Sequence, residues 1–203
     1  MAFMFTNVAG MNLRFPLCVL LVLALSNAGL AENNKVTGLE NAVILIMRHA
    51  QKPDTGHKLS RTGKTRADAC ASYFANLVID GKHLKLDRIF ATKDTRHSHR
   101  PRLTVEPTAR KLGLTIDDRF KDRQFLDLVD EIKSWPRGEN VLISWHHSTI
   151  PRMLRAFGAD PQKLLPNGKW PGHSFDWLIE LRYNQNGQLL ESKRVDACPM
   201  STG

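Results

Sequence analysis

The stretch VILIMRHA, residues 43–50, decides the fold. Its first five residues are all aliphatic or β-branched, and no polar side chain interrupts them. Such a continuous run is typical of a strand buried on both faces, as in a parallel sheet. A second run of this kind, VLISW at residues 141–145, leads directly into His146 and His147. The sequence therefore predicts two central strands that both end in basic or imidazole side chains.

Helical and extended patterns alternate through the chain around these two strands. We expect helices at residues 60–77, 103–112, 125–135 and 150–157, and further strands at residues 86–91, 177–183 and 189–195. Ser60 can cap the first helix, and Gly63 falls early enough in it to be tolerated. The last two strands flank the hairpin signal of residues 184–187. This order favours an α/β three-layer sandwich, with a mainly parallel central sheet, helices on both faces and antiparallel strands at its edge.

Basic side chains collect where three of the expected strands end. They lie in residues 48–49, 95–104 and 146–147, which together hold five histidines and four arginines but few acids. Open α/β sheets bind ligands at the carboxyl ends of their strands. Guanidinium groups bind phosphoryl oxygens bidentately, and backbone N–H groups at helix starts add to this binding. The pattern therefore predicts a site for a phosphate group.

Residues 43–67 resemble the opening of the histidine phosphatase superfamily, which has the phosphoglycerate-mutase-like fold. The family's Arg-His-Gly motif corresponds to Arg48-His49-Ala50, with alanine in place of the usual glycine. Its Leu-Thr/Ser-x-x-Gly-x-x-x-Ala stretch corresponds to residues 59–67. Its second arginine, in an Arg-x-x-x-Thr-x-Glu pattern that opens a helix, is Arg100, and its second histidine, in a His-x-x-x-Ile-Pro pattern, is His146. The matches keep the family's order.

The resemblance implies a phosphatase that uses neither a metal nor another cofactor and acts on a small anionic phosphorylated substrate. It implies that His49 attacks phosphorus and becomes phosphorylated, while Arg48, Arg100 and His146 hold the transferring oxygens. A nucleophilic imidazole must be neutral, and neighbouring cations lower its pKa. Its second ring nitrogen needs an acceptor, for which we expect a backbone carbonyl. The substrate itself, a phosphomonoester or a phosphoramidate, is beyond the sequence because specificity lies in loops.

Three features of the predicted site stay open. His147 adjoins His146, and a shift of one residue would exchange them, although strand length and the Ile-Pro match favour His146. Lys52 and His147 are candidate substrate-binding residues, but a solvated loop explains Lys52 equally well. The general acid is unknown. Four aspartates are candidates without a convincing motif: Asp117, Asp118, Asp122 and Asp127.

The N-terminus predicts export. Arg14 precedes an apolar run at residues 15–25 that is short for a membrane span, and Gly29 and Ala31 place small residues where a signal peptidase cleaves. We expect a signal peptide at residues 1–31, with Met1 or Met11 as the start. Residues 32–203 would then form one phosphatase domain, periplasmic or secreted, without stable membrane insertion. The alternative is an uncleaved anchor or a buried helix.

The three cysteines fit this compartment. Cys18 would leave with the signal peptide, whereas Cys70 and Cys198 would remain. An exported chain with two cysteines permits one disulfide, and two separate thiols are the alternative. The pairing cannot be read from the sequence because it depends on the distance between the Cα atoms.

Two other classes of protein compete with a phosphatase. An exported metal-binding protein could use His97 and His99 or His146 and His147 as ligands, but nearby arginines would repel a cation. A nucleic-acid-binding protein would suit the net charge of +9, from 29 Lys and Arg against 20 Asp and Glu. Nucleic-acid binding is nevertheless not expected, because aromatic residues are few and no basic stripe carries interleaved rings. The oligomeric state is open.

Overall fold

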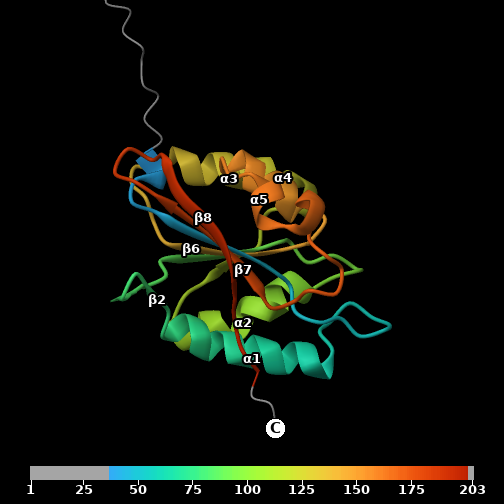
Figure 1. The fold of residues 1–203 in the computed structure, drawn as a ribbon. Helices are drawn as coiled ribbons and strands as arrows, with labels where there is room; N and C mark the ends of the chain where they lie inside the picture. Colours follow the sequence, from blue (N-terminus) through green and yellow to red (C-terminus); the bar gives the residue numbers. More distant parts are fainter. Residues whose placement is uncertain (1–36, 201–203) are drawn as a thin grey trace, which may run out of the picture. The chain divides into compact units, whose positions relative to one another are not determined.

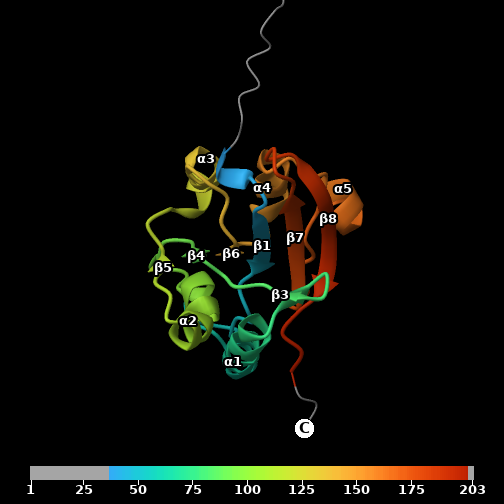
Figure 2. The same ribbon diagram turned by 90° about the vertical axis from the view of Figure 1, so that its left-hand side faces the viewer.

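The computed structural model describes residues 37–200, and a six-stranded sheet lies at their centre in the order β5-β4-β6-β1-β7-β8. The parallel strands are β1 (Val43–Arg48), β4 (Arg88–Ala91), β5 (Ile116–Asp117) and β6 (Val141–Trp145). Strand β7 (Trp177–Tyr183) runs antiparallel to β1 and pairs with β8 (Leu189–Asp196) as a hairpin at the edge. Figure 2 shows this order across the sheet.

Helices cover both faces of the sheet, which confirms the predicted three-layer sandwich (Figure 1). One face carries α1 (Arg61–Ala75) and α2 (Arg100–Leu112). The other face carries α3 (Phe125–Ser134), α4 (Ile150–Ala156) and α5 (Pro161–Leu164).

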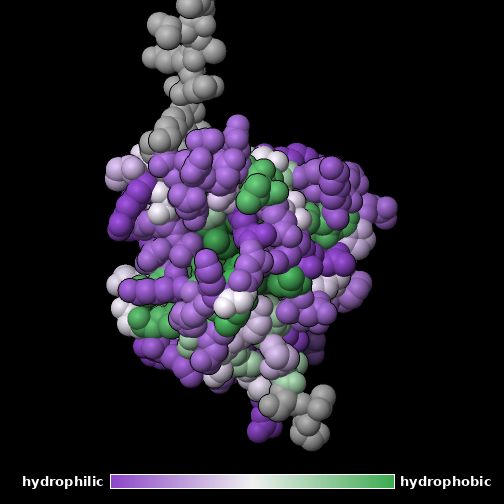
Figure 3. Space-filling view, turned by 60° about the vertical axis from the view of Figure 1, so that its left-hand side comes forward, coloured by the Kyte–Doolittle hydropathy of each residue, from purple (hydrophilic) through white to green (hydrophobic). Residues whose placement is uncertain are grey.

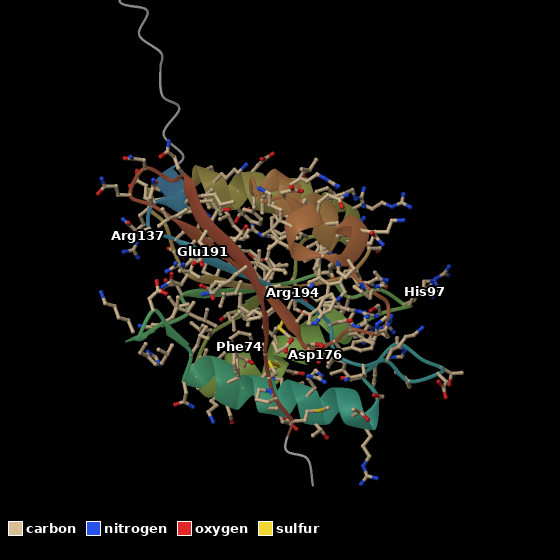
Figure 4. The ribbon with its side chains drawn as sticks, in the orientation of Figure 1. Phe74, His97, Arg137, Asp176, Glu191 and Arg194 are labelled. Carbon is tan, nitrogen blue, oxygen red and sulfur yellow. A yellow bond between two sulfur atoms is a disulfide. The ribbon has the colours of Figure 1, made fainter. Side chains whose placement is uncertain are left out.

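Strand β1 is apolar throughout because each of its faces packs in a separate core. Ile44 and Ile46 belong to the cluster that includes side chains of α3 and α4. Val43, Leu45 and Met47 belong to the cluster with side chains of α1 and α2. Phe74 points from α1 toward the sheet in this second cluster (Figure 4). Each fully buried aliphatic side chain contributes roughly 1.5–3 kcal/mol relative to its exposed state.

The start of α1 fits closely against the loop that follows β1. Ser60 caps the helix, because its Oγ accepts a hydrogen bond from the Gly63 backbone N–H at 3.0 Å. A Cβ atom on Gly63 would lie 2.3 Å from the Gln51 carbonyl oxygen. Glycine is therefore required here rather than merely tolerated, because any side chain would displace the loop two residues beyond His49.

The boundaries of α2 also have local causes. The helix begins at Arg100, three residues before the expected start at Leu103, because Pro101 is well suited to a first helical turn. It ends at Gly113, which adopts the left-handed conformation with φ of 67°. The early start places Arg100 at the helix entrance instead of in the preceding loop.

Several short elements were not predicted. Strands β2 (Val78–Ile79) and β3 (Lys82–His83) form a two-stranded hairpin whose turn residues, Asp80 and Gly81, both have positive φ. The other additions are α5, β5 and three 3-10 turns: η1 (Thr37–Leu39), η2 (Asp122–Gln124) and η3 (Pro166–Gly168). Of these, η2 matters for the site described below.

A disulfide joins Cys70 in α1 to Cys198 near the end of the described chain, which resolves the alternatives left by the sequence. Both cysteines are buried. The bond spans 128 residues of sequence. In the chain-entropy model, a loop of this length corresponds to about 5 kcal/mol of stabilisation. The disulfide therefore anchors the segment after β8 to α1, whose first turn packs against the loop that follows β1.

The predicted signal peptide at residues 1–31 lies outside the described residues. Within residues 37–200, no helix is both long and apolar enough to cross a membrane. The face shown in Figure 3 is mostly hydrophilic, with hydrophobic side chains only in patches among the charged ones.

Candidate active site

A cavity of about 410 Å³ opens at the carboxyl ends of β1, β4 and β6. Figure 1 shows the loops after β1 and β4 extending from the same side of the sheet. Eleven residues line the cavity, and all are polar: Arg48, His49, Lys52, Thr95, His97, Ser98, Arg100, Asp122, His146, His147 and Ser148. The structure thus brings together all six site residues expected from the sequence.

His49 follows the last residue of β1 and is 3% exposed. Its Nδ1 lies 2.7 Å from the Ala50 carbonyl oxygen. A carbonyl oxygen can only accept, so Nδ1 carries the proton and Nε2 keeps its lone pair. Burial lowers the pKa of His49 to about 3, and the charges of His146, Arg48 and Arg100 contribute to this fall. His49 is therefore a neutral imidazole with a free Nε2, as a nucleophile requires.

The backbone beside His49 is held from α2. The Ala50 N–H donates to Thr104 Oγ1 at 2.9 Å, and that hydroxyl in turn donates to the Arg100 carbonyl oxygen at 2.8 Å. Thr104 is fully buried. It therefore links the loop carrying His49 to the helix start carrying Arg100.

Arg48 is oriented by the segment before β7. Its Nη1 donates to the carbonyl oxygens of Gly172 at 2.6 Å, Ser174 at 3.2 Å and Pro171 at 3.3 Å. Its guanidinium carbon lies 3.9 Å from the centre of the Phe175 ring. Burial, with a smaller contribution from Arg100, lowers the pKa of Arg48 to about 10. The buried Nε has no hydrogen-bond partner within residues 37–200.

Arg100 repeats this arrangement from the start of α2. Its Nη1 donates to the carbonyl oxygens of Gly56 and His97, both at 3.4 Å. Burial lowers its pKa. Its Nε is also buried without a partner in the described chain. Buried donors are nearly always paired in proteins, so two orphaned guanidinium nitrogens in one cavity indicate an anion site.

His146 follows β6 and lies beside His49, with ring centroids 5.4 Å apart in an edge-to-face arrangement. Its pKa is lowered mainly by burial and also by Arg100 and Arg48, while Asp122 opposes this shift. His147 lines the same cavity. Burial, Arg48, His146 and Lys52 lower its pKa. Both histidines thus face the cavity, and His146 is the one in ring contact with His49.

Among the four candidate acids, the structure places only Asp122 in the cavity. Its backbone oxygen accepts from Trp145 Nε1 at 3.3 Å, and its Oδ2 accepts from Thr149 Oγ1 at 3.0 Å. Its Oδ1 is buried and unpaired within the described residues. The other three are engaged elsewhere: Asp117 with Arg119, Asp118 with Arg102 and Asp127 with Gln124.

Several polar residues near the site have other partners. Arg102 is bound to Asp94, and its Nη2 lies 2.8 Å from Asp94 Oδ2. The rings of His57 and His99 lie 4.3 Å apart, between the loops after β1 and β4. His97 lies at the right of Figure 4, beside the loops that follow the parallel strands. Its Nε2 accepts a hydrogen bond from Arg96 at 2.8 Å.

The described part of the chain contains no group of three or more His, Cys, Asp or Glu residues placed to hold a metal ion. The pairs His97 with His99 and His146 with His147 therefore remain pairs, without a third ligand of these types among residues 37–200.

Comparison with known proteins identifies the fold. No family model and no curated protein sequence matches the chain. A protein from Agrobacterium tumefaciens assigned as the phosphohistidine phosphatase SixA is 19% identical, with a TM-score of 0.50, and the match covers 75% of this chain and 97% of that one. The alpha-ribazole phosphatase of Shigella flexneri is 10% identical, with a TM-score of 0.50 and coverage of 79% and 98%. This chain therefore has the fold of the histidine phosphatase superfamily, as its sequence resemblance implies.

Proposed function

We propose that this protein is an exported, metal-independent phosphatase that hydrolyses a phosphomonoester or phosphoramidate through a phosphohistidine intermediate on His49. One observation carries the proposal. A buried neutral imidazole with a free Nε2 shares a cavity with two arginines, Arg48 and Arg100, whose buried Nε atoms lack hydrogen-bond partners within residues 37–200. The imidazole is the nucleophile, and the guanidinium groups are the phosphate holders.

In the first step, His49 Nε2 attacks phosphorus and the bond from phosphorus to the leaving group breaks. The transition state spreads negative charge over three equatorial oxygens. Arg48, Arg100 and His146 donate hydrogen bonds to these oxygens. Because their positions are fixed before substrate binds, they stabilise the developing charge without reorganisation.

Asp122 is the acid in this step. It is the sole carboxyl group among the residues that line the cavity, and its Oδ1 has no partner within residues 37–200. In its protonated form it donates a proton to the departing oxygen or nitrogen as the bond to phosphorus breaks. The products of the step are the free alcohol or amine, phosphorylated His49 and ionised Asp122.

In the second step, water attacks the phosphohistidine. Ionised Asp122 accepts a proton from the water, the new oxygen–phosphorus bond forms and the nitrogen–phosphorus bond breaks. Inorganic phosphate leaves, and His49 returns to its neutral form with Nδ1–H still bound to the Ala50 carbonyl. The acid is thereby reprotonated for the next cycle.

Export is part of the proposal. The apolar run at residues 15–25 and the small residues before position 32 support it, as does the disulfide between Cys70 and Cys198. Disulfides persist in oxidising compartments and are rare in the cytosol. We expect material from the periplasm or medium to begin at Glu32. Cytoplasmic protein that retains residues 1–31 would contradict this part of the proposal.

The activity is tested with a panel of phosphomonoesters and phosphoramidates, assayed on protein lacking residues 1–31. We expect phosphate release that is unchanged by a chelator. No release from any substrate would overturn the phosphatase proposal. Activity lost to a chelator and restored by a stoichiometric metal would support a metal-binding protein instead.

A further inference from the structure

We propose that Arg66 is a positioning residue for the reaction. Its guanidinium group joins the loop that follows His49 to the segment that the Cys70–Cys198 disulfide anchors. This inference rests on the proposed phosphatase function and deepens it, because Arg66 does not line the cavity and would act on the nucleophile through another residue.

Arg66 lies in the second turn of α1 and is 7% exposed. Its Nε donates to Gln51 Oε1 at 3.2 Å, and its Nη1 donates to the Cys198 carbonyl oxygen at 3.3 Å. Gln51 is two residues beyond His49, whereas Cys198 lies near the end of the described chain. One guanidinium group therefore binds two segments that are far apart in the sequence.

Packing alone does not explain a buried arginine at this position. Both acceptors are neutral, and within residues 37–200 no acid forms an ion pair with Arg66. Burial lowers the pKa of Arg66, and the charge of Asp176 opposes this shift. Burying a charge without an ion pair is costly, and an apolar side chain would fill the same space without that cost. What the guanidinium group adds is two donors in a rigid, planar arrangement.

The bond to Gln51 is one of three contacts that hold the loop after β1 on the start of α1. The Ser60 N–H donates to the Gln51 carbonyl oxygen at 3.0 Å. Gly63 packs against the same carbonyl, and Arg66 binds the side-chain amide. The backbone and the side chain of Gln51 are therefore both fixed to α1.

This loop determines how the nucleophile is oriented. The Ala50 carbonyl oxygen lies 2.7 Å from His49 Nδ1 and so fixes the direction of the ring. A shift of about 1 Å in a reacting group can cost on the order of a hundredfold in rate. His49 forms its bond in the transition state, whereas the phosphate-binding arginines also hold the ground state. Loss of Arg66 should therefore reduce kcat and leave KM nearly unchanged.

The disulfide fixes the second acceptor of Arg66. Cys70 is four residues after Arg66, so the two side chains lie on the same face of α1. Cys198 is bonded to Cys70 in the segment after β8, which runs beside α1 in Figures 1 and 2. The Ala197 N–H donates to the Asp176 carbonyl oxygen at 2.7 Å. The carbonyl that Arg66 binds is therefore held both by α1 and by the residue before β7.

Arg66→Met tests the inference, because it keeps a long side chain and removes both donors. We expect kcat to fall about tenfold, while KM and the inhibition constant for phosphate change by less than about twofold. Arg194→Met is the control. Arg194 also donates to a backbone carbonyl, that of Leu164 at 2.9 Å, but this bond ties β8 to α5. If Arg66→Met lowers kcat no more than Arg194→Met does, the inference is wrong.

A double-mutant cycle shows whether Arg66 acts through Gln51. Gln51→Leu removes the acceptor and should also lower kcat. The variant with both substitutions should be no slower than the slower single variant, because both remove the same contact. If the two reductions multiply, Arg66 does not act through Gln51 and the inference fails. Gln51→Leu on its own gives the same kcat test if Arg66→Met does not fold.

The double substitution Cys70→Ala/Cys198→Ala tests the anchor. It should lower the free energy of unfolding in the wild type and in Arg66→Met alike. It should lower kcat by about twofold or more in the wild type alone, because in Arg66→Met the link to the loop is already lost. An unchanged kcat in the wild type would mean that the disulfide only stabilises the fold, and would overturn the anchor.

Hydrogen exchange separates failure of this inference from failure of the phosphatase proposal. The Ser60 N–H is bonded to Gln51, so its exchange reports attachment of the loop without any turnover. Exchange at Ser60 should be faster in Arg66→Met than in the wild type or Arg194→Met, while exchange in residues 141–145 stays equal. If no substrate is hydrolysed, the phosphatase proposal fails and exchange decides. Equal exchange at Ser60 in the wild type and Arg66→Met would overturn the role of Arg66.

Discussion

Two groups of arginine and histidine side chains lie near the carboxyl ends of β1 and β4 in opposite electrostatic environments. In the cavity, Arg48 and His49 are each 3% exposed, and their pKa values are lowered by burial and by like charges. Beside it, Arg102 donates to Asp94, and this bond raises its pKa. His99 of the same group lies 3.8 Å from Asp94. Within residues 37–200 no acid forms an ion pair with Arg48, whereas Arg102 and His99 share Asp94.

Under the proposed function, this difference separates the residues that bind the substrate from residues that stabilise the fold. Burying a charge without a partner is costly, so a fold keeps such an arrangement only where a ligand supplies the partner. An arginine already bound to a carboxylate has little left to offer an anion. Composition does not distinguish the two groups, because both are rich in arginine and histidine. The predictions below compare matched variants from each group.

The largest effect is expected from the nucleophile. His49→Ala should lower kcat by at least about a thousandfold, since the proposed covalent intermediate forms on this side chain. His99→Ala, in the compensated group, should lower it by less than about tenfold. Steady-state kinetics with one good substrate, with circular dichroism as a check on folding, make the comparison. More than a few per cent of activity in His49→Ala would remove His49 from its proposed role.

The second comparison lies within the cavity. His146→Ala should lower kcat and kcat/KM together by roughly two to three orders of magnitude, as expected for loss of a donor to the transition state. His147→Ala should have a smaller effect that falls mainly on KM, because this side chain lines the cavity while His146 is the one in ring contact with His49. The reverse order of severity would mean that the two adjacent histidines exchange roles.

A third comparison pairs the two arginines. Arg48→Lys should raise the inhibition constant for inorganic phosphate by about tenfold or more. Lysine cannot replace the planar guanidinium group, which three backbone carbonyl oxygens and the Phe175 ring hold in place. Arg102→Lys should change it by less than about twofold. Competitive inhibition by phosphate gives both constants. If the two substitutions weakened phosphate binding equally, the anion would be bound by the total charge of the protein and not by the buried Arg48 guanidinium group.

The last comparison concerns pH and stability. The pKa of His49 is about 3 in the folded protein, against an ordinary value of 6.5. Below pH 6.5 the unfolded chain therefore binds a proton at this position that the folded chain does not, so stability falls as pH drops toward 3. The limiting slope is about 1.4 kcal/mol per pH unit for each such histidine. Urea unfolding between pH 7 and pH 4 should show a shallower fall for His49→Gln than for the wild type, and parallel curves would contradict the buried neutral state.

Much of the fold could be predicted because the central strands are continuous, mostly apolar runs in the sequence. The apolar runs at residues 43–47 and 141–145 have side chains in two cores, so their pattern reflects burial directly. The β2 and β3 hairpin was missed although its Asp80-Gly81 turn is a strong hairpin signal. Helix α5 was missed although Asp160 caps it and Pro161 opens it. In both cases a local signal was present but lay on an element too short for periodicity to show.

The grouping of the candidate site residues in one cavity was predictable where they end or follow a strand or open a helix, as Arg48, His49, Arg100 and His146 do. Asp122 could not be chosen from four aspartates, because contacts distant in sequence position it. It lies on a 3-10 turn, and its bonds to Trp145 and Thr149 bring it to the cavity. The hydrogen bonds from Arg48 to carbonyl oxygens of residues 171–174 could not be predicted either, because every residue has a backbone carbonyl and the sequence does not show which ones lie near Arg48.

The central claim is that His49, inside the cavity, forms a covalent bond to phosphorus during the reaction. Rapid quenching of the enzyme during turnover of a ³²P-labelled substrate, followed by peptide mapping, measures this directly. We predict an acid-labile, base-stable phosphoryl group on the peptide that contains His49, absent from His49→Ala and present in His99→Ala. Turnover without any labelled His49 peptide, or label on another residue, would contradict the account.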